Sequence, residues 1–301
     1  MKAVATPRSV ATQLRLWWDM TRPRVLLLVL FTGLPVFGLV RAEGHTLGRM
    51  AWVILGTALA GAASSTLNAY LERDTDARMA RTQRRPLPAA AVQPGHALAI
   101  GLGLTVLSTL LLWWVGGAFA AGVGLATILF YVLVYTIWLK PRTPQNIVIG
   151  GAAGSTAPLI AEAALSGQLT WASWVLFLIV FLWTPPHFWA LAIYRKEEYA
   201  AAGFPMMPSV VGNASTRRQS LVYAILLLLT TLTPVPLGML SMFYGAVALL
   251  AGGWFAWRVY VSMRADDPQV DYAVFRDSIR YLFLLFGAML LDLAVAAALH
   301  G

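Results

Sequence analysis

The sequence of 301 residues contains no cysteine, and only 12% of its residues are charged. The absence of cysteine excludes disulfide bonds, catalysis by a thiolate and metal sites built from cysteine. The charged fraction is well below that of soluble globular domains, in which about a quarter of the residues carry charge. The composition therefore argues against an ordinary water-soluble domain.

The sequence also lacks a long basic tail, although its formal net charge is +9. The basic residues cluster in loops between apolar runs. Basic loops of this kind set the orientation of membrane proteins, so we interpret the charge as membrane topology and expect no nucleic-acid partner. The first apolar run is long enough to span a bilayer, so we expect no cleaved signal peptide.

Hydrophobic residues are abundant instead, at 59% of the chain. Runs of about 20 apolar residues recur along its whole length, which is typical of a polytopic helical membrane protein. We predict an all-α membrane protein with a single domain over residues 1–301, beginning with a polar segment at 1–20. Nine transmembrane helices are predicted, at residues 25–40, 51–71, 97–115, 118–138, 146–164, 171–193, 221–241, 243–261 and 279–298.

The basic residues support this number of spans. If the N-terminus is cytoplasmic, all lysines and arginines except Arg41 and Arg49 fall in cytoplasmic segments. Cytoplasmic loops carry an excess of these residues, so we predict a cytoplasmic N-terminus and an external C-terminus in the plasma (inner) membrane. The two long cytoplasmic segments, 72–96 and 194–220, predict a functional face on that side, with a central cavity opening toward it.

A cluster of charged residues follows the second apolar run. If the helix of that run continues, Asn68, Glu72 and Asp76 lie on one face, about 6 Å apart per step. An amide and two carboxylates stacked in this way are oxygen ligands suited to Mg²⁺. Several arginines nearby supply the charge that a phosphate-rich anion needs: Arg73, Arg78, Arg81, Arg84 and Arg85. The alternative is that these charges only sit in water and set orientation, but acidic residues contribute little to orientation.

A second polar cluster follows the sixth apolar run. Pro185 and Pro186 cannot donate backbone hydrogen bonds, so we expect the helix to break or kink there and to line a cavity. His187 follows directly, and both a structural and a functional role are open for it. The next segment repeats the mixture of acids and bases, with Arg195, Lys196, Glu197 and Glu198. This second set would hold a second metal or the far end of the same anion.

Aromatic and basic residues end the fourth run. Trp138 is interpreted as part of an interfacial aromatic belt. Lys140 and Arg142 are candidates for pairing with a phosphate or a carboxylate, and Tyr135 and Asn146 flank them. Two isolated acids near the outer ends of spans are interpreted as structural and hydrated: Glu162 and Asp292.

Mg²⁺ and arginines together suit a diphosphate leaving group, because they neutralise the charge that grows on the departing oxygen. An allylic carbon that loses diphosphate becomes a delocalised cation, which aromatic faces stabilise and a dry pocket protects from water. A transporter would place polar residues along a path through the membrane. Here they crowd one face, which favours a prenyltransferase.

The motifs resemble those of a known family. The run from Asn68 to Pro88 looks like the first acidic motif of the intramembrane UbiA-type polyprenyltransferases. The fuller set resembles the branch of protoheme IX farnesyltransferases (haem O synthases). That set is collinear over about residues 21–212 and comprises Thr21–Val25, Arg81–Pro86, Tyr135–Lys140, Gln145–Gly154, Thr184–Ile193 and Ala202–Pro208.

The resemblance implies a bundle of nine helices around a central cavity. It implies transfer of a farnesyl group from farnesyl diphosphate to the vinyl carbon of haem B, followed by addition of water to give haem O. Mg²⁺ would be the cofactor. The protein would be embedded in the lipid bilayer, and a haem A synthase is a candidate partner. Asn68, Glu72 and Asp76 correspond to the metal–diphosphate motif, in which Glu72 departs from the more usual aspartate. Asp74 corresponds to an extra acid of this branch.

The second motif of the family normally has two acids four residues apart. Here Glu198 fills one place, and Tyr194 stands in the other. The implied metal ligands are Asn68, Glu72, Asp76 and Glu198, and the first three of these would act in catalysis together with Lys140. The implied substrate contacts are Arg73, Asp74, Arg81, Arg85, Tyr135, Arg142, Asn146, His187, Arg195, Lys196 and Glu198. Of these, His187 is a candidate for contacting the haem iron or a propionate.

Two alternatives remain open from the sequence. A prenyltransferase with an aromatic acceptor, such as a quinone precursor, would share the first motif but has no evident need for the Thr184–Ile193 block. A haem or lipid transporter without catalysis would not depend on carboxylates that bind a metal.

Overall fold

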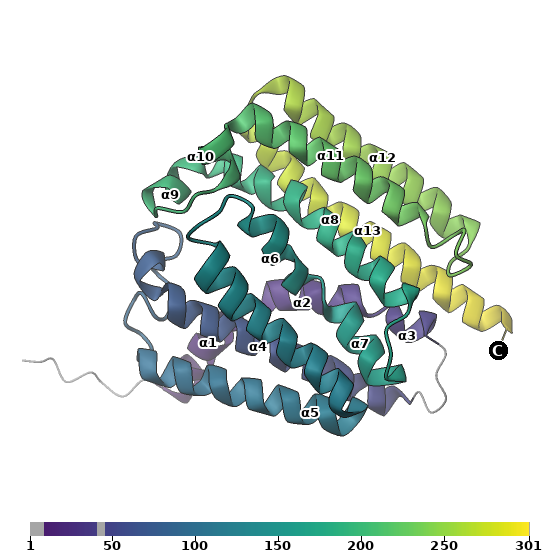
Figure 1. The fold of residues 1–301 in the computed structure, drawn as a ribbon, viewed down its shortest axis with the longest axis horizontal. Helices are drawn as coiled ribbons and strands as arrows, with labels where there is room; N and C mark the ends of the chain where they lie inside the picture. The colour runs from purple at the N-terminus through teal and green to yellow at the C-terminus, as the bar shows by residue number, and fades with distance from the viewer. Residues whose placement is uncertain (1–8, 41–45, 301) are drawn as a thin grey trace, which may run out of the picture.

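The computed structural model of the protein describes residues 9–40 and 46–300, which form helices and connecting turns and contain no β-strand (Figure 1). The helices are α1 (Val10–Met20), α2 (Pro23–Gly33), α3 (Val36–Leu39), α4 (Leu47–Asp76), α5 (Pro94–Leu129), η1 (Phe130–Leu139), α6 (Asn146–Gly154), α7 (Ala157–Ser166), α8 (Trp171–Tyr194), α9 (Lys196–Ala201), α10 (Met207–Val211), α11 (Asn213–Leu232), α12 (Met242–Ala265) and α13 (Pro268–His300). The predicted all-α class is confirmed. Most of the predicted polar segment 1–20 is the helix α1, and residues 1–8 lie outside the described ranges.

Within the described ranges, six helices are long and apolar enough to cross a membrane, or up to seven if the bent pair Ala11–Met20 and Pro23–Leu39 is one span. One of the six is the continuous stretch Pro94–Leu139, which has 46 residues. At 1.5 Å per residue this stretch is about twice as long as the ~30 Å hydrocarbon core is thick. Each of the nine predicted segments overlaps a helix, but the number of nine spans stays a prediction.

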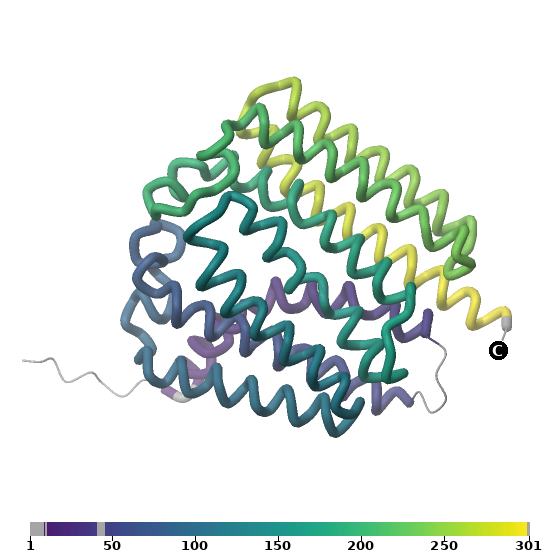
Figure 2. The backbone as a smooth tube through the Cα atoms, viewed as in Figure 1, coloured from purple at the N-terminus to yellow at the C-terminus, as the bar shows by residue number. Residues whose placement is uncertain are grey.

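The helix α5 turns back on itself at Gly117, which has φ 76° and ψ −173°. Glycine adopts this conformation readily because it has no Cβ. A Cβ added to Gly124 would lie 2.4 Å from Cδ1 of Leu112, although these residues would be about 18 Å apart along a straight helix. The backbone tube in Figure 2 reverses direction at this point. The third and fourth predicted spans therefore form an antiparallel pair.

The long helices pack in two groups. One contains α8, α11, α12 and α13, and the other contains α4, α5 and η1, while α2, α6 and α7 contact members of both (Figure 1). The largest apolar cluster lies mainly in the first group, where Leu176, Phe255 and Tyr281 are fully buried. Close packing of side chains is what holds helices together in a lipid environment, because the lipid tails are themselves apolar.

The two long polar segments meet at one end of the bundle. The loop after α4 lies beside α9 and α10 there, and the C-terminal end of α13 lies at the opposite end (Figure 1). A buried apolar cluster joins Met79 of the loop to Trp189 of α8, Tyr199 of α9 and Met207 of α10. The two segments therefore share one face of the protein. Which side of the membrane this face occupies stays a prediction.

Of the predicted break or kink at Pro185 and Pro186, the break is wrong, and a kink stays a prediction. The helix α8 continues through both residues, and both are buried. Each proline removes only one backbone hydrogen bond, and α8 is packed between α11, α13 and α6. Support from neighbouring helices is what allows prolines inside membrane helices.

Glu162 and Asp292 are structural, as predicted, but they are buried rather than hydrated, with exposed fractions of 0% and 8%. Glu162 accepts hydrogen bonds from the backbone N–H and the hydroxyl of Thr170 and from the Ser173 hydroxyl. Asp292 accepts them from the backbone N–H and the hydroxyl of Ser241. Thr170 and Ser241 are the N-cap residues of α8 and α12, so each carboxylate stabilises the N-terminus of a neighbouring helix.

A substitution in α5 tests the close approach of α5 to α7. A Cβ on Gly116 would lie 2.4 Å from Cα of Ala164, which is a backbone atom. We expect Gly116→Ala to lower the free energy of unfolding by about 1–3 kcal/mol, because overpacking forces the helices apart. Unfolding of the purified protein in detergent measures the effect. Gly122→Ala is the matched control, since nothing lies within 4 Å of its added Cβ, and equal stability of the two variants would contradict the close approach.

Candidate functional site

The candidate site is built on one face of α4. Asn68, Glu72 and Asp76 are exposed by only 1%, 7% and 5%, so their side chains point into the protein and not into lipid. The helix extends as far as Asp76, and residues four apart on an α-helix share a face. The predicted stack of oxygen ligands is therefore a buried row, which we call the α4 ladder.

Each member of the α4 ladder is bonded to a cationic side chain from elsewhere in the chain. The pairs are Arg22 Nη2 with Asn68 Oδ1 at 2.8 Å, Lys140 Nζ with Glu72 Oε1, and Arg85 Nη1 with Asp76 Oδ2 at 2.7 Å. Burying an uncompensated charge costs several kcal/mol, so these partners are what allows two carboxylates to be buried together. Burial and the neighbouring Arg22 lower the pKa of Arg85, while Asp76 opposes this shift.

Arg22 is a site residue that the sequence analysis missed. It lies between α1 and α2 with φ 53° and ψ 58°, a left-handed conformation that costs roughly 1–2 kcal/mol for a residue other than glycine. Besides its bond to Asn68, Arg22 interacts electrostatically with Glu72 and Asp76. In the sequence, an arginine at the start of a span is equally well explained as an orientation signal. Only its place in the Thr21–Val25 motif hinted at the site.

The segment η1 supplies the second cation through an unusual backbone. It is a π-helix, in which N–H groups bond to the carbonyl five residues earlier, as Lys140 N does to Tyr135 O at 2.9 Å. In an α-helix, residues five apart are turned about 140° from each other. The wider π turn therefore brings Tyr135 and Lys140 to the same side.

Contacts from η1 reach two members of the α4 ladder. The hydroxyl of Thr136 accepts a hydrogen bond from Asn68 Nδ2 at 3.1 Å, and Lys140 bonds to Glu72. The ammonium of Lys140 also lies 4.7 Å from the ring centroid of Phe204. Burial lowers the pKa of Lys140, and Glu72 opposes that shift. Lys140 is thus a desolvated cation held against a carboxylate.

The second polar cluster adjoins this site through Tyr199. This buried tyrosine interacts electrostatically with Arg81 and Arg85 of the loop after α4, and with Arg195 and Glu198. Burial raises the pKa of Tyr199, and Arg81 opposes the shift. Arg195 Nη1 donates to Glu198 Oε1 at 2.6 Å. Within the described residues, the other carboxylate oxygen of Glu198 is buried and has no hydrogen-bond partner.

Several predicted site residues lie elsewhere. The side chain of Asp74 is 80% exposed and pairs with Arg73 at 3.6 Å, because both residues are rotated away from the α4 ladder around the helix. Arg142 donates to two carbonyl oxygens near the end of η1. Lys196 begins α9. Substrate contacts by these residues stay predictions.

Two other predicted residues form hydrogen bonds with groups outside the α4 ladder. Asn146 is completely buried, and its Nδ2 donates to the Thr143 carbonyl at 2.6 Å. Its Oδ1 has no partner in the part of the chain that the structure describes. His187 lies on α8 facing α13, where its Nδ1 is 2.6 Å from Oγ of Ser278.

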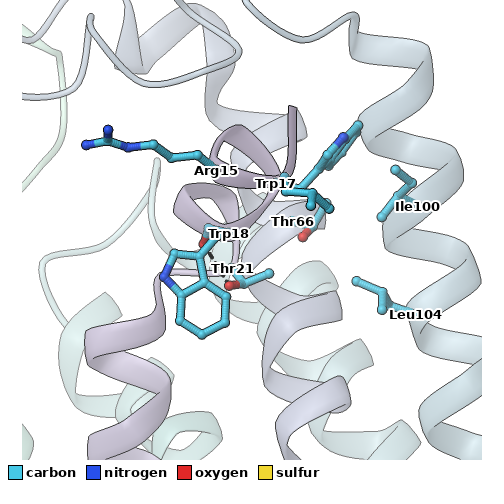
Figure 3. Close-up of a pocket in the computed structure, with 8 residues that line it drawn as sticks. Arg15, Trp17, Trp18, Thr21, Thr66, Ile100 and Leu104 are labelled. Carbon is cyan, nitrogen blue, oxygen red and sulfur yellow. Dashed lines mark hydrogen bonds between the residues drawn. The ribbon is translucent and has the colours of Figure 1, made fainter. Parts of the chain in front are cut away.

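The predicted central cavity is not confirmed. A cavity of about 20 Å³ borders the α4 ladder, with Arg22, Asp76 and Arg85 in its lining. A larger hollow, of about 620 Å³, is an apolar groove between α1, α4 and α5. In Figure 3, Trp17 of α1 lies across this groove from Ile100 and Leu104 of α5. The large space is therefore separate from the charged site.

The donor set at the α4 ladder fits Mg²⁺ bound together with a phosphate-bearing substrate. Mg²⁺ is usually held by one or two carboxylates plus substrate phosphates, and the ladder offers Glu72, Asp76 and the amide of Asn68. Among the described residues, no group of three or more histidines, aspartates or glutamates converges on one point. Phosphate oxygens would therefore have to complete the coordination. The free oxygen of Glu198 is a further ligand candidate.

The sequence matches the model of the UbiA prenyltransferase family over residues 27–290. The chain belongs to this family. Curated relatives named protoheme IX farnesyltransferase include one from Synechococcus elongatus, 48% identical over 94% of this chain and 90% of the relative. Another, from Rhizobium meliloti, is 44% identical over 96% of this chain and 93% of the relative. The family resemblance, including its branch, is confirmed, and this prenyltransferase is an integral multi-pass membrane protein.

Solved structures show that the prenyltransferase has the UbiA fold. A digeranylgeranylglyceryl phosphate synthase superposes with a TM-score of 0.78 at 14% identity, covering 94% of this chain and 99% of that chain. A UbiA homologue from Archaeoglobus fulgidus, bound to DMAPP and Mg²⁺, superposes with a TM-score of 0.66 at 14% identity, covering 90% and 99%.

A glycine pair in α6 tests how the site is positioned. A Cβ on Gly150 would lie 2.1 Å from the ring of Tyr135, so Gly150→Ala should push the tyrosine and the adjoining Lys140 out of place. We expect at least tenfold weaker binding of farnesyl diphosphate, measured by calorimetry in detergent. Gly154→Ala is the matched control, since its added Cβ meets nothing within 4 Å. Equal binding by the two variants would show that the position of Tyr135 does not matter for the anion.

Proposed function

We propose that this prenyltransferase transfers the farnesyl group of farnesyl diphosphate to a vinyl group of haem B, forming haem O and releasing diphosphate. The observation that carries the proposal is the buried α4 ladder, with three cations bonded to it. The names of relatives at 44–48% identity support the choice of haem B as the acceptor. The UbiA homologues solved with DMAPP or GPP and Mg²⁺ support an isoprenoid diphosphate as the donor.

The reaction balances without an external oxidant or reductant. The bond between C1 of the farnesyl group and the diphosphate oxygen breaks, and the electron pair leaves with diphosphate. The terminal vinyl carbon of haem B uses its π electrons to form the new carbon–carbon bond. Water adds to the cation that remains on the former vinyl group and loses a proton, which gives the hydroxyethylfarnesyl side chain.

The described residues suit the first of these steps. Arg22, Lys140 and Arg85 would exchange their ladder partners for diphosphate oxygens, stabilising the charge that grows as the bond breaks. Glu72 and Asp76, with Asn68, would hold Mg²⁺. When bound, this ion supplies further positive charge to the leaving group. The ring of Tyr135, on the same side as Lys140, would face the allylic cation.

His187 would contact the acceptor haem, at its iron or at a propionate. The alternative with an aromatic acceptor is not favoured, because the curated relatives that cover nearly the whole chain are named for protoheme IX. A transporter is not favoured either, because the chain belongs to a family of prenyltransferases. A plasma (inner) membrane location with the charged face in the cytoplasm fits the distribution of basic residues, and haem A synthase stays a candidate partner.

Removing the ladder charges tests the metal role. We expect Glu72→Gln combined with Asp76→Asn to lower the rate of farnesyl transfer at least 100-fold, because the stabilisation of the leaving group is lost. Conversion of haem B in the presence of farnesyl diphosphate and Mg²⁺ measures the rate. Asp267→Asn removes an exposed carboxylate outside both polar clusters and is the control. Unchanged transfer in the ladder variant would rule out the proposed role.

The identity of the acceptor needs its own experiment. Membranes containing the protein are incubated with farnesyl diphosphate and either haem B or an aromatic quinone precursor. We expect a more hydrophobic haem, with the mass of haem B plus a farnesyl group and a hydroxyl group, and no prenylated aromatic product. A prenylated aromatic product without any change in haem B would show that the acceptor is aromatic and not haem B.

A further inference from the structure

A row of aromatic rings runs along the seam between α8 and α13. We call it the ring row, and it consists of Trp183, His187, Phe275, Tyr272 and Tyr194. The centroid distances between successive rings are 4.1, 4.7, 5.9 and 4.6 Å. The corresponding interplanar angles are 18°, 28°, 17° and 25°. The rings are therefore nearly parallel and form one continuous stack.

The ring row is not sealed inside the core. Trp183 is buried, but the other four members are only partly buried. Because every ring has at least one face against a neighbouring ring, we infer that the accessible parts of the row are mainly ring edges. Ring edges carry partial positive charge and meet the face of another π-system in the favourable edge-to-face arrangement. The edge of the ring row is thus a surface suited to a large, flat, aromatic ligand.

The hydrogen bonds of His187 within the described residues fix which of its ring nitrogens is an acceptor. Oγ of Ser278 donates its only proton to the carbonyl of Phe275 at 2.6 Å, so toward His187 it acts as an acceptor. Nδ1 of His187, at 2.6 Å from that oxygen, must then carry the proton. In a neutral imidazole the other nitrogen, Nε2, is left as an acceptor. Its lone pair lies in the plane of the ring, so it points out of a ring edge.

Positive charge lies at one end of the ring row. The guanidinium of Arg276 is 5.3 Å from the ring centroid of Tyr272, and that of Arg195 is 5.8 Å from Tyr194. Arg195 is already paired with Glu198. Arg276 is exposed and makes no salt bridge within the described residues, whereas Arg280, one turn further along α13, pairs with Asp277 at 2.9 Å. Arg276 is therefore the cation at this end that is available to an anionic ligand.

We propose that the edge of the ring row is the docking surface of the acceptor porphyrin, with a propionate carboxylate of haem B bound by Arg276. The inference rests on the proposed function, and it adds the location and the orientation of the acceptor. A porphyrin is flat and aromatic and carries carboxylates on one side only, which matches a ring edge with a cation at one end. Arg195 connects this end to Glu198, so the acceptor lies beside the loops of the α4 ladder.

The test measures haem binding separately from farnesyl diphosphate binding. Haem B is titrated into the purified full-length protein in detergent and followed by its absorption spectrum. We expect Arg276→Gln to weaken haem binding about tenfold, because a charge-assisted hydrogen bond is lost, with unchanged affinity for farnesyl diphosphate. Arg280→Gln is the matched control, since it removes an arginine of the same helix outside the ring row, and it should bind haem B like the wild type.

The dimethyl ester of haem B, which lacks both carboxylates, identifies the contact itself. We expect wild type and Arg276→Gln to bind the ester equally. Tyr272→Leu should weaken binding of both haem B and the ester, because the edge contact does not involve the carboxylates. Equal binding of haem B by Arg276→Gln and Arg280→Gln would overturn the docking surface. So would a parallel loss of farnesyl diphosphate binding in Arg276→Gln, because that would indicate a general disturbance.

The two proposals fail in different ways. If the wild type binds no haem B, or prenylates only an aromatic acceptor, the proposed function is wrong. The proposed docking surface is then wrong as well. If the wild type makes haem O and Arg276→Gln still binds haem B normally, only the docking surface is wrong.

Discussion

Charge compensation of the α4 ladder is the constraint on which the rest of this structure depends. Two carboxylates buried on one helix face are tolerable only if cations reach them, because desolvated charges are costly without partners. The three partners come from the link between α1 and α2, the end of η1 and the loop after α4. Satisfying one helix face thus ties together segments that are far apart in the sequence.

Two backbone conformations that normally cost free energy occur next to the α4 ladder. Arg22 adopts a left-handed conformation to reach Asn68, and η1 is a ten-residue π-helix where an α-helix has better geometry. Such features persist where the surroundings hold them, and they cluster at functional sites. In this protein both deliver positive charge to the same place, where a diphosphate would need it.

The proposed chemistry depends on the same cations, which would bind diphosphate in place of the ladder residues. The cations that compensate the ladder residues in the free protein are already partly buried, and in the proposed reaction they would exchange those partners for phosphate oxygens when the substrate binds. The acceptor needs a different surface, flat and aromatic, and the seam between α8 and α13 provides one. In the proposed arrangement, donor and acceptor would be recognised by separate helix groups that meet through α9 and its flanking loops.

The sequence by itself determined the helical class, the family and the alignment of Asn68, Glu72 and Asp76, because hydropathy, motif spacing and helical periodicity are local properties. It did not determine that Arg22 joins the site, that the turns of η1 widen to bring Lys140 beside Tyr135, or that α8 continues through Pro185 and Pro186. Nor did it show that Asp74 faces outward while Asp76 pairs with Arg85. These outcomes depend on contacts between residues distant in the chain, whose energies exceed local preferences, so only the tertiary structure decided them.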